Sequence, residues 1–211
     1  MAVIRNLKNM SFSGRIGDII GCVGSKRKYI RSVPRKKTQQ EFSALQLASH
    51  RKLAMASALI SPIRSLLEKT MTRRSKTHST GYGAAISHLL QSGFKGEYPD
   101  LEINYAQLMV SSGNLARTRA TLELHEQSNI LLKWDLDCTS IDAIKEQAAL
   151  LIYNQDRNEY AMKWNIANRL TTQATVPLPE HFKNQRLHYY FFFHNSEFKK
   201  ASATHYLGFT S

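Results

Sequence analysis

Cysteine is scarce in this chain, and no long stretch is free of charge. Only two cysteines occur among 211 residues, Cys22 and Cys138, and they lie far apart. Two scattered cysteines form neither a disulfide framework nor a zinc set, so a reducing compartment is the simplest interpretation. No uncharged stretch is long enough to span a membrane, and residues 1–10 contain no apolar run typical of a signal peptide. We therefore expect a protein of the cytoplasm or of an assembled particle.

Acidic residues are scarce in the first 81 positions. That part holds 17 Lys and Arg against 3 Asp and Glu, a balance of +14, whereas residues 82–211 hold 12 against 13, a balance of −1; together they give the net +13. All of the excess positive charge therefore lies in the first part. Such asymmetry favours an acidic partner, whether nucleic acid, an anionic surface or an acidic protein. The alternative is a solvated basic surface that keeps the protein soluble.

Enzyme motifs are missing as well. The N-terminal glycines fit neither the phosphate-binding loop nor the dinucleotide fingerprint, and no Gly-x-Ser-x-Gly elbow occurs. The eight histidines form no His-x3-His pair and none lies beside a cysteine pair. Asp135 and Asp137 fall on one face of an alternating segment, and paired carboxylates can act as general acid and base, but at a strand end such a pair more often forms a solvated edge or a turn. We predict a protein that is not an enzyme and that needs neither cofactor nor metal.

Residues 11–33 are predicted to form a glycine-rich hairpin. Glycines interrupt an isoleucine-rich first strand, and an alternating return strand over 29–33 ends before Pro34. Because glycine weakens a strand unless something packs closely on it, we expect residues 1–37, the arm, to lie on another surface. The residues expected to pack there are Gly14, Gly17, Gly21, Gly24 and Tyr29.

Residues 38–96 are predicted to be helical. Thr38 and Glu41 have the spacing of a capping box, and apolar residues recur at the helical period to about residue 60. Pro62 is expected to end or kink this first helix. A short second helix follows, and the third covers 80–92.

Residues 97–211 are predicted to form an antiparallel β-sandwich in the immunoglobulin or fibronectin type III style, which makes the fold class α+β. Short alternating segments are separated by turns. The aromatic run 189–193 is predicted to be a core strand with one face inward, rather than a surface on which bases stack. The expected strands cover 101–105, 122–124, 130–134, 149–153, 160–164, 187–193 and 206–207.

Basic side chains form two clusters, which are the strongest chemical signal in the sequence. Phosphate neutralisation needs many such side chains but no fixed spacing, and a single tyrosine among them is no stacking platform. The residues predicted to contact a partner or phosphate are Lys26, Arg27, Lys28, Arg31, Arg35, Lys36, Lys37, Arg73, Arg74 and Lys76.

Two segments, FSGRIGDIIG at 12–21 and YIRSVP at 29–34, resemble the opening of an uncharacterised family of Bacteroidetes proteins of similar length. Further similar segments follow in order over nearly the whole chain: RKLA at 51–54, PIR at 62–64, YPD at 98–100, GNL at 113–115 and YLG at 206–208. The family is known only as a domain of unknown function, so the resemblance implies no activity. This chain differs in having the basic run 26–28 where the family usually has a tryptophan.

Two functions follow as hypotheses. The first is a structural or assembly protein, for example a subunit of a phage-like particle, whose arm docks on a neighbouring subunit by strand pairing. The second is a nucleic-acid-binding module that contacts phosphates through its basic N-terminal region. The spaced glycines favour assembly, because a solvated basic face does not explain them.

Overall fold

The computed structural model describes residues 13–23, 28–35, 42–71, 80–125, 129–136 and 141–210. By its internal packing the chain divides into two compact units, residues 1–43 and residues 44–211. The divisions expected at residues 37 and 96 stay predictions.

The first unit contains a three-stranded antiparallel sheet in the order β1-β2-β3. Its strands are β1 (Gly14–Ile16), β2 (Ile19–Val23) and β3 (Lys28–Ser32). The predicted hairpin is the β2–β3 pair. Of the turn predicted at 24–28, Lys28 is the first residue of β3 and the rest lies outside the described residues. β1 is an additional strand, joined to β2 through a turn in which Gly17 has a φ of +56°. That left-handed conformation favours glycine.

The second unit begins with the helices α1 (Ala44–Ile60), α2 (Arg64–Thr70) and α3 (Gly81–Ser92). Pro62 lies in a 3-10 turn between α1 and α2, where its missing N–H is tolerated. The predicted start of α1 is wrong: the helix begins at Ala44, and the expected capping box at 38–41 lies outside the described residues. The Thr80 hydroxyl caps α3 by accepting a hydrogen bond from the Gly83 N–H at 3.0 Å.

Two larger sheets follow, in the strand orders β12-β11-β8-β9 and β10-β7-β6. Of the strand predicted at 101–105, only two residues form a strand, β5, which pairs with β4. The sequence pattern did not predict β10. The strands are β4 (Phe94–Lys95), β5 (Glu102–Ile103), β6 (Ala120–His125), β7 (Asn129–Trp134), β8 (Glu146–Asn154), β9 (Glu159–Lys163), β10 (Gln173–Pro177), β11 (Leu187–Asn195) and β12 (His205–Thr210).

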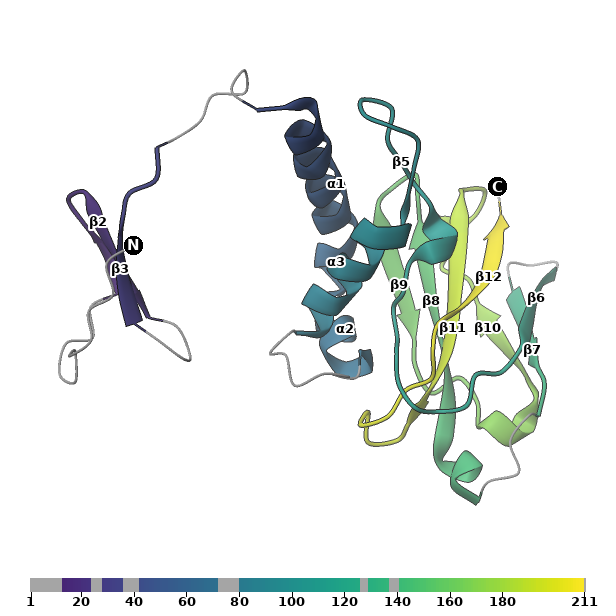
Figure 1. The fold of residues 1–211 in the computed structure, drawn as a ribbon. Coiled ribbons are helices and arrows are strands. Elements are labelled where there is room, and N and C mark those ends of the chain that lie inside the picture. Colours follow the sequence, from purple (N-terminus) through teal and green to yellow (C-terminus); the bar gives the residue numbers. More distant parts are fainter. Residues whose placement is uncertain are drawn as a thin grey trace. The chain divides into compact units, whose positions relative to one another are not determined.

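The second unit has three layers: the helices cover one face of the β8–β11 sheet, and the β6–β7–β10 sheet packs on the other face (Figure 1). Alternate residues of β11 therefore enter different cores. Tyr190 and Phe192 pack with the helices, whereas Tyr189, Phe191 and Phe193 pack between the sheets. The α+β class is confirmed, but the prediction that this strand has one face inward is wrong, because the helical layer buries its second face.

Candidate assembly interface

The sheet of the first unit, here called the arm sheet (β1, β2 and β3), has two chemically different faces. Cross-strand partners lie on the same side of a sheet, and residues alternate between its sides. The observed register pairs Ile16 with Ile19, Gly21 with Ile30, and Arg15 with Ile20. One side, the apolar face, therefore carries Gly14, Ile16, Ile19, Gly21, Val23, Lys28, Ile30 and Ser32. The other side, the basic face, carries Arg15, Ile20, Cys22, Tyr29 and Arg31.

The apolar face is largely exposed. Ile16 is 61% exposed, Val23 is 48% exposed and Ile19 is 44% exposed. Gly21 is the one buried residue among the described residues of the arm. A sheet that is stable by itself in water needs three or more strands with a hydrophobic face, and within the described residues of the arm sheet these aliphatic side chains stay open.

Two glycines of the arm, Gly14 in β1 and Gly17 in the β1–β2 turn, are explained by backbone conformation. Gly14 has a φ of +127° and Gly17 a φ of +56°. A methyl group added at either position would meet no atom of the described residues within 4 Å. Left-handed backbone, rather than close packing inside the chain, therefore accounts for both residues.

The described part of the predicted basic cluster is exposed. Lys28, Arg31 and Arg35 all lie at the surface, and Arg31 shares the basic face with Arg15 and half-buried Tyr29. The Arg15 Nε donates a hydrogen bond to the Gly17 carbonyl at 2.9 Å, which holds this guanidinium beside the β1–β2 turn. The remaining predicted site residues lie outside the described residues: Gly24, Lys26, Arg27, Lys36, Lys37, Arg73, Arg74 and Lys76.

The pair of carboxylates considered for catalysis is described only in part. Asp135 is exposed after β7, and Asp137 lies outside the described residues. Within the described ranges, no three His, Cys, Asp or Glu side chains are grouped so that they could hold a metal ion. None of the helices in those ranges combines the length and the apolar character that crossing a bilayer requires.

His188 is buried in β11 as a structural residue. Its Nδ1 lies 2.8 Å from the Tyr206 hydroxyl, its Nε2 lies 3.1 Å from the Gln155 amide oxygen, and its ring stacks on Tyr105. Burial, with a smaller contribution from the positive charge of Arg186, lowers the pKa of His188 to about 4. The imidazole is therefore neutral in the folded protein at pH 7.

The free energy of unfolding of the second unit is expected to fall as the pH drops from 6.5 to about 4. In this window the unfolded chain binds a proton on His188 that the folded chain does not, so linkage favours unfolding. Urea denaturation at pH 7, 5.5 and 4 measures the change. The variant His188→Gln, which retains polar atoms toward Tyr206, should have a shallower pH dependence. An equal pH dependence in both proteins would contradict this assignment.

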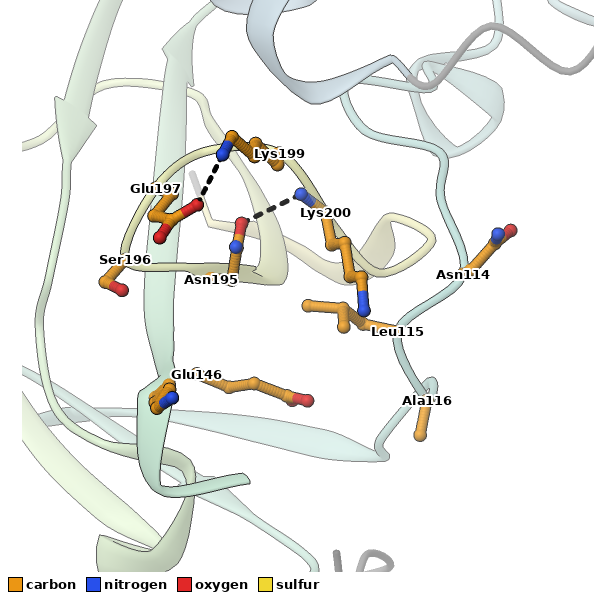
Figure 2. A pocket seen from close by; sticks show the side chains of 10 residues that line it. Asn114, Leu115, Ala116, Glu146, Asn195, Ser196, Glu197, Lys199 and Lys200 are labelled. Atoms are coloured by element: carbon orange, nitrogen blue, oxygen red, sulfur yellow. Dashed lines mark hydrogen bonds and ion pairs between the residues drawn. The ribbon is translucent and has the colours of Figure 1, made fainter. Parts of the chain in front are cut away.

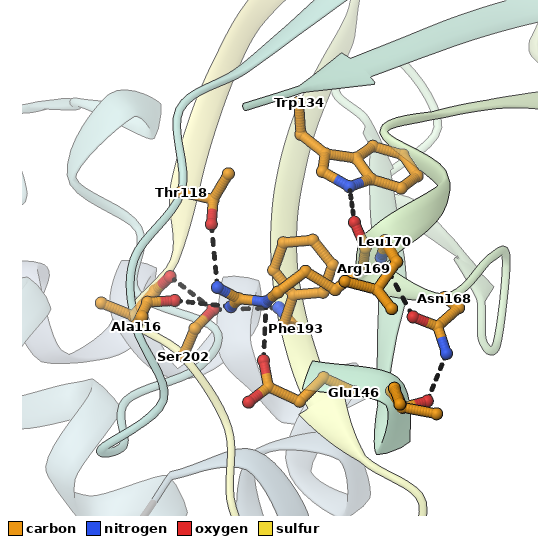
Figure 3. A network of polar contacts seen from close by, with 11 residues as sticks. Ala116, Thr118, Trp134, Glu146, Asn168, Arg169, Leu170, Phe193 and Ser202 are labelled. Carbon is orange, nitrogen blue, oxygen red and sulfur yellow. Dashed lines mark hydrogen bonds and ion pairs between the residues drawn. The ribbon is translucent and has the colours of Figure 1, made fainter. Parts of the chain in front are cut away.

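A buried arginine that sequence reasoning missed joins three segments of the second unit (Figure 3). Arg169 is fully buried, and its Nε lies 2.6 Å from a carboxylate oxygen of Glu146. Its other nitrogens donate to the Ala116 carbonyl at 2.6 Å and to the Thr118 hydroxyl at 3.1 Å, and its guanidinium lies 4.1 Å from the centroid of the Phe193 ring. No sequence signal marks this residue, because its partners are remote along the chain.

Comparison with known proteins gives one informative match. A family model matches residues 11–208, nearly the whole chain, and it describes a family of unknown function (DUF6266). No curated protein matches the chain, and no solved structure does.

Proposed function

Because the chain belongs to the DUF6266 family, which has no known function, we propose from its own surfaces that it is a non-enzymatic assembly protein whose arm docks on a neighbouring subunit. The predicted absence of enzymatic activity is part of this proposal.

The observation that carries the proposal is the exposed apolar face of the arm sheet. Ile16, Ile19 and Val23 are each more than two-fifths exposed, on a sheet that belongs to a separate compact unit. An exposed apolar patch of this kind is typical of a protein–protein contact. Among the described residues the outer edges of β1 and β3 pair with no further strand, and such edges can pair with a strand of a neighbour.

We take a second copy of this chain as the occupant, with its arm-binding surface outside its own arm. The arm, residues 1–37, holds ten Lys and Arg but a single acidic residue, a balance of +9. Two arms would therefore repel each other at low salt. Fifteen of the sixteen acidic residues of the chain lie outside the arm, with nineteen Lys and Arg, a balance of +4. The rest of a second copy therefore repels the arm less than another arm does, and it holds the carboxylates with which the arm can pair.

The test compares two double variants of the full chain by size-exclusion chromatography with light scattering. Ile16→Ser with Val23→Ser removes apolar surface, and burial of each such side chain contributes about 1.5–3 kcal/mol. Association should weaken about a hundredfold, since 1.4 kcal/mol corresponds to a factor of ten. Arg15→Ser with Arg31→Ser is the matched control on the basic face and should associate almost normally. A wild-type protein that remains monomeric across the micromolar range would overturn self-assembly.

Nucleic-acid binding is the alternative, and the shared placement of Arg15, Tyr29 and Arg31 on the basic face favours it. The same two double variants separate the functions, because phosphate contacts would reverse their order of effect. If about six phosphates are neutralised, the log–log salt slope on duplex DNA would be near −5. Absence of DNA binding at low salt, or binding that salt does not weaken, removes this alternative.

A further inference from the structure

A pocket at one end of the second unit contains polar groups from three remote segments (Figure 2). Its volume is about 440 Å³, which lies in the range of small-molecule sites. The walls come from the loop before β6, the start of β8 and the turn between β11 and β12. The lining residues are Asn114, Leu115, Ala116, Lys145, Glu146, Asn195, Ser196, Glu197, Lys199 and Lys200.

The buried Arg169 network fixes two of these walls. Arg169 binds the Ala116 carbonyl on one wall and the Glu146 carboxylate on another (Figure 3). The Leu115 N–H donates to the Ala201 carbonyl at 3.1 Å, which ties the first wall to the segment after the turn. The pocket is therefore held in shape by contacts inside the protein, as a binding site requires.

The β11–β12 turn is held in an unusual conformation. Phe198 has a φ of +54°, a region in which a bulky side chain is an outlier. Its ring stacks on His194, with centroids 4.4 Å apart, and meets the edge of Trp164 at 5.0 Å. The Asn195 side-chain oxygen accepts the Lys200 N–H at 2.8 Å. Such outliers concentrate at functional sites, and this one directs the backbone that carries Lys199 and Lys200 to the pocket.

The pairing of charges leaves two lysines available. Glu146 is paired with Arg169, and Glu197 with Lys199 at 2.7 Å. The Lys199 ammonium lowers the pKa of Glu197, and the carboxylate raises the pKa of Lys199. Lys145 and Lys200 form no ion pair within 4 Å with a carboxylate of the described residues, although the charge of Lys145 adds a smaller contribution to the lowered pKa of Glu197. Both are exposed residues of the pocket lining. The surplus charge of the site is therefore positive.

We propose that this pocket binds the phosphate group of a small organic phosphate. Lysine ammonium groups bind phosphate as point charges, and two of them match the charge of a phosphate dianion. The side chains of Asn114 and Ser196 and the side-chain amide nitrogen of Asn195 offer further donors. Leu115 and Ala116 line the remaining wall and suit a carbon skeleton.

The test is a titration of the ¹⁵N-labelled full chain with inorganic phosphate, with chloride adjusted to constant ionic strength. Amide signals of 114–116, 145–146 and 195–200 should shift together. In Lys145→Gln with Lys200→Gln the apparent Kd should rise at least about tenfold, since each charge-assisted hydrogen bond contributes about 1.5–3 kcal/mol. Lys95→Gln with Lys163→Gln is the control, because exposed Lys95 and half-buried Lys163 both lie outside the pocket, and it should bind phosphate normally.

Three results would overturn the proposal. The first is an equal Kd in the pocket variant and in the control, with both proteins folded as judged by their dispersed spectra. The second is a set of shifts confined to the arm, which would assign phosphate binding to its basic residues instead. The third is acetate shifting the same pocket signals with equal affinity, which would assign the pocket to carboxylates.

Discussion

Replacement of Arg169 by alanine is expected to lower the free energy of unfolding of the second unit by about 3–5 kcal/mol, because it removes the guanidinium that forms an ion pair with the buried carboxylate of Glu146. The side chain also loses its hydrogen bonds to Ala116 and Thr118 and its contact with the Phe193 ring. Urea denaturation monitored by tryptophan fluorescence measures the loss, since Trp134 donates its indole N–H to the Arg169 carbonyl.

Two further variants separate the buried charge from the packing of the side chain. Arg169→Met with Glu146→Gln removes both charges and should recover part of the lost stability, because no unpaired buried charge remains. Arg186→Met breaks an exposed ion pair with Asp156 and should have little effect, since water screens such pairs. A loss below about 1 kcal/mol in Arg169→Ala would show that the buried pair does not hold the fold together.

Truncation of Phe192 or of Phe191 to alanine is expected to cost about 3–5 kcal/mol in each case. The two residues are adjacent in β11, yet Phe192 lies in the core beneath the helices and Phe191 in the core between the sheets. Both are at most 1% exposed, so each truncation leaves a cavity in a different layer. Chemical denaturation of the single variants measures both costs.

Phe209→Ala on β12 is the matched control, because this ring is 65% exposed. Its expected effect is within about 0.5 kcal/mol. If Phe191 were costly to truncate but Phe192 were not, the helical layer would not be packed on the sheet as described.

The central strands of the second unit could be predicted because their sequences are unmistakable. The apolar run at 149–153 and the aromatic run at 189–193 both became strands. Their second buried face could not be predicted, because alternation identifies one face and an uninterrupted run also fits a strand buried on both faces. The pairing of β8 with β11 joins segments more than thirty residues apart, and no local pattern reports it.

Shorter elements were missed for physical reasons. β1 has three residues, Gly14–Ile16, which are too few to show alternation. β10 has the sequence QATVP, in which only Val176 is buried, so its strand conformation depends on pairing with β7. The capping box at Thr38 and Glu41 satisfied a local rule, yet α1 begins at Ala44.

The candidate sites, too, could be predicted from the sequence only in part. The basic and glycine-rich character of the arm is visible in the sequence, but the separation into an apolar and a basic face depends on the register of three strands. The pocket draws Lys145 and Lys200 from segments that are remote along the chain. Its shape depends on Arg169, which no local pattern distinguishes from a surface arginine.

The layered packing of the second unit has a consequence for its synthesis. The helices end at Ser92, but the strand that supplies Tyr190 and Phe192 to cover them ends at Asn195. At about 5–20 residues per second, the ribosome needs roughly 5–20 s to make the intervening hundred residues. During that interval the nascent chain displays Leu59, Ile60 and Leu67 without their cover. Native folding of this unit is therefore completed only after β11 has left the ribosome.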